Sequence, residues 1–482
     1  MQKLPLRSPD RSRARRQYAR NGYSIGALGA AAIGGAVIFG ALSSAVFARA
    51  SISADTFRQL DLFGEVFEQV HENYVTDPED GDLIKGAIDG MLDTLDPHSS
   101  YLTAEDFQTM QEQTRGTFAG LGIQIVMDNE GPDKGYVKVV APIEDTPADR
   151  AGILTNDLIV EIDGEAVLGM TIDEAISKLK GEKGTKVDIK VQRARDADPF
   201  GLTIVRDIVT VQSVRWRAEG DFAYIRIATF SEQTEDGVRK AIKKLSKEIP
   251  GGPKGLILDL RSNPGGLLDQ SIAVSDVFLE GGEIVSTRGR RPRDTLREMG
   301  TPGDKLSGKP IIVLINGGSA SASEIVAGAL QDRNRALLLG TKSFGKGSVQ
   351  TVIPLQNGLQ GALRLTTARY YTPSGRSIQA QGIEPDIAMP VIYPGQDENA
   401  QRPAERDLPG ALDVSEAEEP LEDADLATVD DATAAPDAEP FECSFEEDGE
   451  TPIDCQLDRA LEILADATQY RQLLADAGGA RH

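Results

Sequence analysis

The chain has 482 residues, of which 40% are hydrophobic, and a formal net charge of −25 at pH 7. This length is sufficient for two or three domains with real cores, and the lack of a basic face argues against a nucleic-acid binder. The acidity is uneven: residues 1–50 carry eight Lys or Arg and one Asp, whereas the chain from Asp397 onward carries 25 Asp or Glu and five Arg.

Residues 1–50 predict an export signal. Seven of the first 20 residues are Lys or Arg, and the 25 residues from Ser24 to Ala48 then run without a charge. A basic flank before an apolar stretch favours a cytoplasmic N-terminus with the rest of the chain translocated. The apolar stretch is long enough to span a bilayer, and Ala48-Arg49-Ala50 is compatible with a cleavage site. A cleaved signal peptide and an uncleaved signal anchor both stay open.

Residues 55–115 are expected to be helical. Apolar residues recur at three- and four-residue intervals, as they do on one face of a helix: Phe57, Leu60, Phe63, Val66, Phe67 and Val70. Asp96-Pro97 ends the pattern, because a proline disfavours the helical conformation in the residue before it. His98 follows in a loop, where we expect a surface or capping histidine rather than a catalytic one.

Residues 116–204 have the character of a small β-rich domain. Short β-branched runs at 120–126, 135–143, 157–167 and 186–193 alternate with helix-like patches at 146–153 and 171–180. This order resembles a PDZ domain of the circularly permuted bacterial kind, and Gly120-Leu121-Gly122-Ile123 resembles its carboxylate-binding loop. Glycines let successive backbone amides converge on a terminal carboxylate. The alternative is that Gly120 and Gly122 merely form a tight turn.

Residues 205–394 form the largest predicted domain. Its apolar strand candidates are 222–230, 254–261, 310–317, 336–341 and 349–355, and its helix candidates are 235–247, 267–279 and 321–331. Alternation of short apolar strands with helices is typical of an α/β architecture. Two glycine-rich corners, Asn263-Pro264-Gly265-Gly266 and Asn316-Gly317-Gly318, follow strand candidates, and such corners are where α/β proteins usually assemble their sites.

Ser321 is the candidate nucleophile of this domain. All three histidines of the chain lie far from it in sequence, so a nucleophilic serine here needs another base. Ser321 precedes Glu324 by three residues, a pattern that also fits a helix capping box with no catalytic role. A helix N-terminus equally favours negative charge on the hydroxyl oxygen and on a nearby oxyanion. Ser319 and Ser323 compete for the same role.

Lys346 is the candidate base. It stands between Gly345 and Gly347, 25 residues after Ser321. Burial lowers the pKa of a lysine from about 10.4 and can bring it near neutrality, where the amine accepts a proton. Gln350 follows four residues later and is placed to orient the amine. The alternatives are a surface lysine or a phosphate contact, although the segment lacks the register of a P-loop.

The tail from residue 395 differs again. Residues 416–454 hold 16 acids and no Lys or Arg, so we expect a disordered acidic linker over 395–453. Leucines at helical spacing predict a C-terminal helix over 454–482. Cys443 and Cys455 would close a disulfide loop in an oxidising compartment. Their spacing gives no metal pattern, and neither a metal nor a cofactor is expected.

Together these segments resemble the carboxyl-terminal processing, or tail-specific, serine proteases with a PDZ domain. Beside the PDZ loop, the motifs that carry the resemblance are LDPHSSY at 95–101, DLRSNPGG at 259–266, GGSASASE at 317–324, GTKSFGKGSVQ at 340–350 and GIEPDI at 382–387. The resemblance implies an α/β multi-domain fold. It comprises a helical N-terminal lead, a PDZ-like β-rich domain, a ClpP/crotonase-like α/β protease core, and a disordered acidic tail with a terminal helix.

The resemblance also implies the site. Ser321 and Lys346 take the roles of a catalytic dyad, supported by Gln350, and the backbone amides of Ala322 and of Gly265 or Gly266 take the role of an oxyanion hole. The implied activity is that of a serine endopeptidase that cleaves exported or membrane-attached proteins near their C-termini. The PDZ domain would bind the C-terminus of the substrate.

The expected partners are protein or peptide substrates with free C-termini. The expected location is the bacterial periplasm, where the protein is soluble or anchored to the inner membrane by its N-terminal segment. The sequence does not decide whether the protein uses an adaptor protein or forms a homo-oligomer. Two alternative functions also stay open: a catalytically inactive PDZ scaffold and a crotonase-like acyl enzyme, the latter by fold analogy alone. The PDZ-like insert and the export signal argue against the acyl enzyme.

Overall fold

The computed structural model describes residues 53–128, 134–193, 198–394, 403–413, 440–445 and 452–480. The predicted export segment, residues 1–50, lies outside them. The chain divides into two compact units, Met1–Leu83 and Ile84–His482. Within the described ranges, no helix combines the length and the apolarity that a membrane crossing requires.

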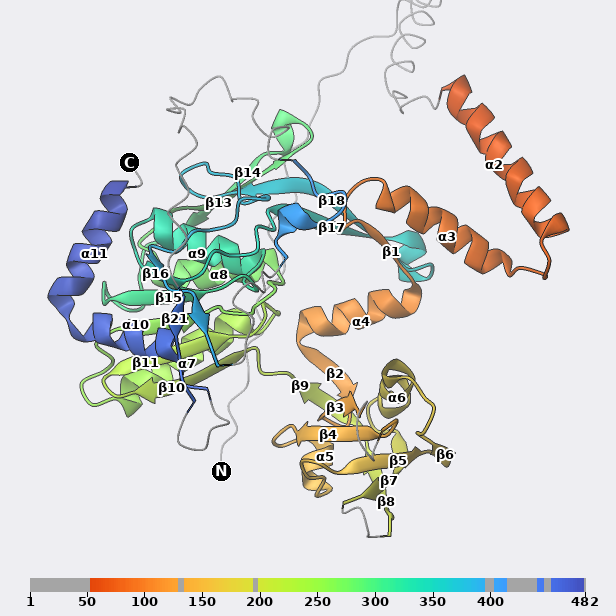
Figure 1. The fold of residues 1–482 in the computed structure, drawn as a ribbon, viewed down its shortest axis with the longest axis horizontal. Helices are drawn as coiled ribbons and strands as arrows, with labels where there is room; N and C mark the ends of the chain where they lie inside the picture. Colours follow the sequence, from red (N-terminus) through yellow and green to blue (C-terminus); the bar gives the residue numbers. More distant parts are fainter. Residues whose placement is uncertain are drawn as a thin grey trace, which may run out of the picture. The chain divides into compact units, whose positions relative to one another are not determined.

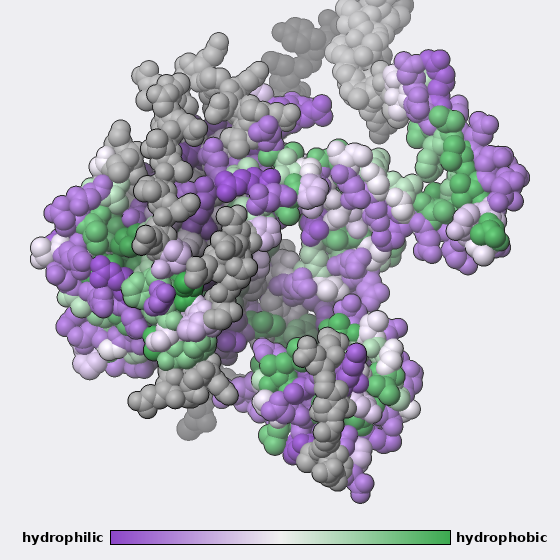
Figure 2. Space-filling model, viewed as in Figure 1, coloured by the Kyte–Doolittle hydropathy of each residue, from purple (hydrophilic) through white to green (hydrophobic). Residues whose placement is uncertain are grey.

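The N-terminal region contains the expected helices (Figure 1). In the first unit, α2 (Ala54–Asn73) begins at Ser53, whose hydroxyl accepts the N–H of Thr56. None of its residues is buried, and Figure 2 shows apolar side chains along its surface. These exposed residues are Phe57, Leu60, Leu62, Phe63, Val66 and Val70. The unit boundary falls within α3 (Asp80–Asp93), and β1 (Ser100–Leu102) and α4 (Ala104–Arg115) follow it.

The predicted β-rich domain comes next. Its main sheet has the order β3-β4-β5-β7-β8, with β6 paired to β5. Its elements are β3 (Ile123–Met127), β4 (Val137–Pro142), α5 (Pro147–Arg150), β5 (Leu158–Ile162), β6 (Glu165–Ala166), α6 (Ile172–Leu179), β7 (Lys186–Gln192) and β8 (Phe200–Val205). Alternate residues of β7 are buried, which is the two-residue period of a strand with one face on a core. β8 is an addition to the expected strands.

Two short strands stand at the ends of this domain. β2 (Thr117–Gly120) and β9 (Asp207–Thr210) pair antiparallel, with Phe118 opposite Val209. The chain therefore enters and leaves the β-rich domain side by side.

The largest domain is built on a six-stranded sheet in the order β10-β11-β12-β15-β16-β19. Its strands are β10 (Val214–Glu219), β11 (Phe222–Ile227), β12 (Leu256–Asp259), β15 (Ile311–Ile315), β16 (Leu337–Gly340) and β19 (Ile387–Ala388). β10 is antiparallel to β11, and the remaining pairs are parallel. Every residue of β12, β15 and β16 is buried, because the parallel part of the sheet is covered on both faces.

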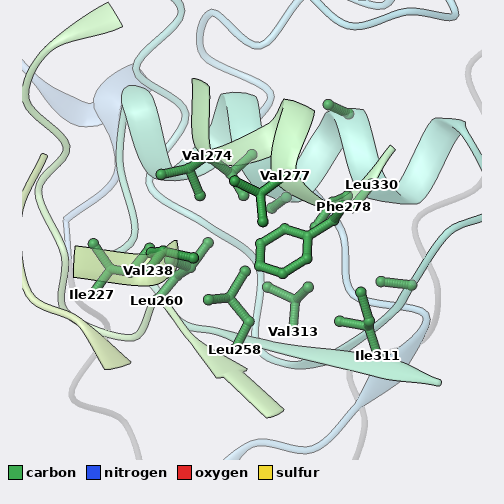
Figure 3. Close-up of a cluster of buried hydrophobic side chains, with 14 of the residues drawn as sticks. Ile227, Val238, Leu258, Leu260, Val274, Val277, Phe278, Ile311, Val313 and Leu330 are labelled. Atoms are coloured by element: carbon green, nitrogen blue, oxygen red, sulfur yellow. The ribbon is translucent and has the colours of Figure 1, made fainter. Parts of the chain in front are cut away.

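Helices cover both faces of this sheet. On one face lie α7 (Thr234–Glu248), α8 (Leu268–Phe278) and α9 (Ala322–Asp332), and Figure 3 shows the Phe278 ring between helices and the strand residues Leu258 and Val313. On the other face, α10 (Cys455–Ala465) and α11 (Ala467–Ala480) pack against the alternate residues Ile257 and Ile312. The α/β architecture inferred from the sequence is confirmed.

A second sheet contributes to the hydrophobic core of the same domain. It has the order β1-β18-β13-β14, with β17 paired to β18. Its further strands are β13 (Gly282–Gly289), β14 (Leu296–Gly300), β17 (Ser348–Pro354) and β18 (Ala362–Tyr371), with the 3-10 turns η2 (Pro292–Asp294) and η3 (Leu355–Gly358) between them. The sequence predicted β17 alone. β13, β14 and β18 each carry Arg together with Glu or Thr within the strand, so no apolar run marks them.

Short parts of the tail contain regular structure where the sequence predicts a disordered linker, and the rest of that linker, residues 395–402, 414–439 and 446–451, lies outside the described residues. Inside the expected disordered linker, 395–453, residues 403–413 contain the 3-10 turn η4 (Glu405–Asp407), and β21 (Phe441–Glu442) pairs parallel with β20 (Val391–Ile392). The expected single C-terminal helix is two helices. It breaks at Asp466, whose carboxylate accepts the N–H groups of Thr468 and Gln469 in the first turn of α11. Cys443 and Cys455 form a disulfide.

Candidate active site

The three serines in the turn after β15 and at the start of α9 are used differently. Ser319 donates its hydroxyl to the carbonyl of Leu260 at 2.9 Å, and Ser323 donates to the carbonyl of Asn263 at 3.0 Å. Both of these serines are fully buried. Ser321 makes no such bond, and it lines a cavity of about 680 Å³. The structure therefore separates Ser321 from its two competitors.

Ser321 has an unusual backbone conformation. Its φ is 53° and its ψ is −113°, and a positive φ is uncommon for a residue with a side chain. Its N–H donates to Glu324 Oε2 at 2.6 Å, but the N–H of Glu324 donates to the carbonyl of Ser321 rather than to its hydroxyl. Only half of the capping box is formed, so the Ser321 hydroxyl is not used as a helix cap.

Tyr370 is the neighbour of the Ser321 hydroxyl. Burial raises the pKa of Tyr370 to about 12, against the effect of its side-chain hydrogen bond with Ser321. The phenol is therefore a neutral partner for the serine at any physiological pH. The sequence did not single out this residue.

Glu324 joins the serine to the lysine loop. Its fully buried carboxylate accepts the hydroxyl of Ser343 at 2.5 Å and the N–H groups of Ser321, Gly345 and Lys346 at 2.6, 2.7 and 2.9 Å. Burial raises the pKa of Glu324 to about 7, although the four hydrogen bonds act in the opposite direction. The sequence predicted only a helix cap here, because contacts to a loop 19 to 22 residues away leave no local pattern.

Lys346 lies in this loop and is partly buried. Burial lowers its pKa, and the carboxylate of Glu405 is the strongest of the charges that oppose this shift. Nowhere in the described chain does its Nζ form a hydrogen bond or an ion pair. The structure thus brings a lysine with a lowered pKa to the site, but it does not join the amine directly to Ser321 or Gln350.

Gln350 lines the same cavity as Ser321, but its amide is bonded elsewhere. Its Nε2 donates to Ser348 Oγ at 2.9 Å and to Thr366 Oγ1 at 3.2 Å, and Thr366 Oγ1 donates to Asp96 Oδ1 at 3.0 Å. Burial acts to raise the pKa of Asp96, but hydrogen bonds from Ser99 and Thr366 among others hold it below its usual range. The motif before β1 therefore supports Gln350 through Thr366, a link that the sequence did not predict.

The sequence predicted a surface or capping histidine at His98, and the structure shows that the side chain is not on the surface. Its side chain is 17% exposed, and its Nε2 lies 2.8 Å from both carboxylate oxygens of Glu405. The two residues are 307 positions apart. No sequence pattern around His98 marks a partner that distant.

Two of the three predicted oxyanion amides are available. The N–H of Gly265 donates to Asn263 Oδ1 at 2.9 Å, whereas those of Gly266 and Ala322 meet no protein acceptor among the described residues. A Cβ built on Gly265 would lie 2.9 Å from the Cβ of Ser321. The glycine corner therefore packs against the serine, and Gly266 is the glycine whose amide can serve an oxyanion.

The cavity beside Ser321 combines apolar walls with acidic groups. Its apolar lining comprises Leu267, Leu268, Ile272, Ala273, Met299 and Val349. Its acidic lining comprises Asp269, Asp276 and Glu298. Such a cavity suits an extended peptide with an apolar side chain near the serine.

The predicted peptide-binding loop lies between β2 and β3. Gly120 ends β2, Ile123 begins β3, and Leu121 is buried. Gly122 has a φ of 80°, and a Cβ there would lie 2.3 Å from the Cβ of Thr146. In the described part of the domain, the N–H groups of Leu121 and Gly122 meet no protein acceptor. The tight turn is therefore present, and two amides in it have no protein acceptor.

Comparisons with known proteins identify the family of this chain. Residues 221–389 match peptidase family S41, residues 138–193 match the PDZ domain, and residues 41–106 match the activating protease CtpB N-terminal domain. A carboxy-terminal-processing protease of Bartonella bacilliformis is 53% identical over 348 residues, which cover 71% of this chain and 79% of the relative. The chain belongs to the carboxy-terminal-processing protease family. It is a serine peptidase with a PDZ domain.

Further relatives of this family are more distant. The carboxy-terminal processing protease CtpA of Bacillus subtilis is 35% identical over 347 residues, which cover 72% of each chain. A solved structure of a photosystem II D1 C-terminal processing protease is 30% identical and covers 68% of this chain and 92% of that one, with a TM-score of 0.40. Membership of the peptidase family S41 removes the crotonase-like acyl enzyme from the alternatives.

Proposed function

We propose that this peptidase cleaves proteins near their C-termini with a Ser321–Lys346 dyad. One observation carries the proposal: of three neighbouring serines, Ser321 alone has a hydroxyl in an open cavity, beside uncommitted backbone amides and near a lysine with a lowered pKa. That combination meets the three needs of acyl transfer, which are a nucleophile, a base and an oxyanion site.

The reaction follows from these groups. Neutral Lys346 takes the proton from Ser321 Oγ, and the oxygen adds to the peptide carbonyl carbon. The oxyanion that forms accepts hydrogen bonds from the amides of Gly266 and Ala322. The lysine ammonium then gives its proton to the amine nitrogen as the peptide C–N bond breaks. The amine product departs, and the remaining acyl group stays bound to Ser321 as an ester. Water adds to this ester with Lys346 as base, and the acid product leaves as the serine regains its proton.

The lysine must turn toward the serine before this reaction. Its amine makes no hydrogen bond in the structure, and its four-carbon side chain can reorient without moving the backbone, which Glu324 holds. Gln350 sits in the cavity and can receive the amine once it has turned. Substrate binding would favour the turned state by removing water from the cavity.

The proposal also covers how the substrate is recognised and where in the cell the peptidase acts. The amides of Leu121 and Gly122 support capture of a free C-terminal carboxylate by the PDZ domain. The basic, then uncharged, N-terminal segment supports export to the bacterial periplasm, in soluble or anchored form. The apolar cavity supports a preference for apolar side chains at the cleaved bond.

Mass spectrometry of peptide digests tests this proposal. Peptides of one sequence, with a free or an amidated C-terminus, are incubated with the wild type, Ser321→Ala and Lys346→Ala. We expect cleavage by the wild type alone, and preferentially of the free-acid peptide. Turnover by Lys346→Ala at the wild-type rate would reject the dyad. A wild type that binds the peptides, cleaves none and fails to react with a serine-directed fluorophosphonate would favour the inactive PDZ scaffold.

A further inference from the structure

A buried carboxylate from the tail lies beside the lysine loop. Glu405 belongs to η4, beyond the segment 221–389 that matches the peptidase family. It is fully buried, although glutamate is almost never buried without a partner. Its N–H donates to the carbonyl of Phe344 at 3.0 Å. The tail is thus attached to the backbone of the loop, two residues before Lys346.

The side chain of Glu405 makes a second attachment to the same loop. Its Oε1 accepts Gln379 Nε2 at 3.0 Å, and Gln379 Oε1 in turn accepts the N–H of Gly347 at 3.0 Å. His98 Nε2 lies 2.8 Å from both carboxylate oxygens. Glu405 therefore holds the loop on both sides of Lys346, once through its backbone and once through Gln379.

The charges around Lys346 come from four directions. Glu405 (η4) and Asp96 (the loop before β1) favour its ammonium form, as does Glu324 (α9), whereas Arg364 (β18) and burial favour the neutral amine. The buried Nε of Arg364 has no hydrogen-bond partner within the described chain. After burial, Glu405 exerts the largest influence.

We propose that Glu405 is a positioning residue for Lys346: it fixes the loop that carries the lysine, through Phe344 on one side and Gln379 on the other, and holds its buried carboxylate at this loop. The inference rests on the proposed function of Lys346 as the base. It makes residues 403–413 a working part of the peptidase rather than a piece of linker. It also explains why a carboxylate is buried there, since an amide would form similar hydrogen bonds without the charge.

Substitutions of Glu405 separate the two roles. Glu405→Gln keeps the size and most of the hydrogen bonds but removes the charge, whereas Glu405→Ala removes both. Asp407→Asn is the matched control, because Asp407 lies two residues away in η4, is 54% exposed and bonds only the N–H of Ala404 and the neighbouring Arg406. The full-length proteins are compared by the rate of hydrolysis of fluorescein-labelled casein, well below KM, across pH.

The rate should rise with pH as Lys346 loses its proton. Loss of a negative charge disfavours the ammonium, so in Glu405→Gln this rise should move to lower pH by at least about half a unit. Glu405→Ala should in addition lower the plateau at least about tenfold, since a misplaced base loses rate steeply. Asp407→Asn should leave both unchanged. The inference would be overturned if the midpoint pH of the rise in rate were unchanged in Glu405→Gln, or if it shifted by the same amount in Asp407→Asn.

Two controls keep the outcome unambiguous. His98→Gln shows whether the imidazole is the titrating group: the rise in rate must persist in this variant, and its disappearance would overturn the assignment to Lys346. Thermal melting monitored by circular dichroism shows whether each variant folds; if Glu405→Ala does not fold, the pH profile of Glu405→Gln decides. Casein hydrolysis that survives in Ser321→Ala would reject the proposed function itself, whereas wild-type behaviour of Glu405→Gln would reject only the role of Glu405.

Discussion

At Lys346, burial and charge act in opposite directions. Burial removes water from the ammonium and lowers its pKa, while Glu405, Asp96 and Glu324 stabilise the ammonium and limit the fall. A base needs both effects: an amine with too high a pKa is never free, and one with too low a pKa takes no proton from a hydroxyl. The pKa of Lys346 therefore depends on the position of the loop relative to these carboxylates as much as on how deeply the loop is buried.

This balance predicts the pH dependence of the peptidase. The value of kcat/KM should rise with pH as Lys346 is deprotonated, with a midpoint below 10.5 because burial lowers the pKa. Lys346→Arg keeps the positive charge but cannot supply a free base, so its rate should fall by about 10²- to 10⁴-fold at every pH. Initial rates of casein hydrolysis from pH 5 to 10 measure both. An arginine variant with a wild-type profile would show that another group is the base.

Glu324 offers a second test among single residues. It accepts hydrogen bonds from four donors. In Glu324→Gln an NH₂ group would replace one of the two accepting oxygens, and it cannot accept the hydrogen bonds that this oxygen received. The turn of Ser321 and the lysine loop would then lose their common anchor, and we expect a loss of at least about a hundredfold in kcat/KM.

Glu248→Gln is the matched control for this test, because Glu248 is exposed at the end of α7. It should retain full activity. Fluorophosphonate labelling of Ser321 and thermal melting would show whether Glu324→Gln is folded but misaligned. Normal labelling and turnover in Glu324→Gln would mean that the anchor is dispensable.

Among the elements, the glycine corner after β12 and the turn before α9 depend on close contact. Gly265 has a φ of +101°, and a Cβ there would meet Ala320 O at 2.8 Å, Ser321 Cβ at 2.9 Å and Ala322 N at 3.0 Å. The clash cannot be relieved by a side-chain rotation, because two of the three atoms belong to the backbone and the third, Ser321 Cβ, is bonded directly to it. The oxyanion site and the nucleophile therefore share one packed corner.

Gly265→Ala should consequently be inactive. The added methyl would push the corner away from Ser321, and the left-handed conformation adds strain, so we expect unfolding free energy to fall by about 1–3 kcal/mol. Gly308→Ala is the control, because Gly308 has a φ of +75° with open space around it. It shares the strain but not the clash. Peptide hydrolysis and urea denaturation measure the two effects, and equal losses in both variants would contradict the packing argument.

The sequence predicted the elements whose residues carry a local pattern. β12, β15 and β16 are continuous apolar runs because both faces are covered, and Ser321, Lys346 and Gln350 lie in recognisable motifs. β18 was missed because it contains charged and hydroxyl side chains that face partly into solvent. The contact of His98 with Glu405 was missed because nothing in either segment marks a contact across 307 residues.

For the molecule as a whole, the C-terminal helices complete the core. α10 and α11 cover a face of the sheet that would otherwise expose Ile257 and Ile312. Arg261, just before the glycine corner, bonds both Asp259 of β12 and Asp454 at the start of α10, each at 2.7 Å. The end of the chain is thereby attached to the segment that leads into the active site.

Tyr470 makes the attachment of α11 testable. Its buried hydroxyl donates to the carbonyl of Ile311 at 3.0 Å and accepts the N–H of the same residue at 3.1 Å. Tyr470→Phe leaves both backbone groups of Ile311 without this partner, so we expect unfolding free energy to fall by about 1–3 kcal/mol. Tyr101→Phe is the matched control, because the Tyr101 hydroxyl donates to the carbonyl of Gln360 in an exposed contact, where water can replace it. Urea denaturation of the full chain compares them. A loss in Tyr470→Phe no larger than in Tyr101→Phe would mean that apolar packing alone holds α11 on the sheet.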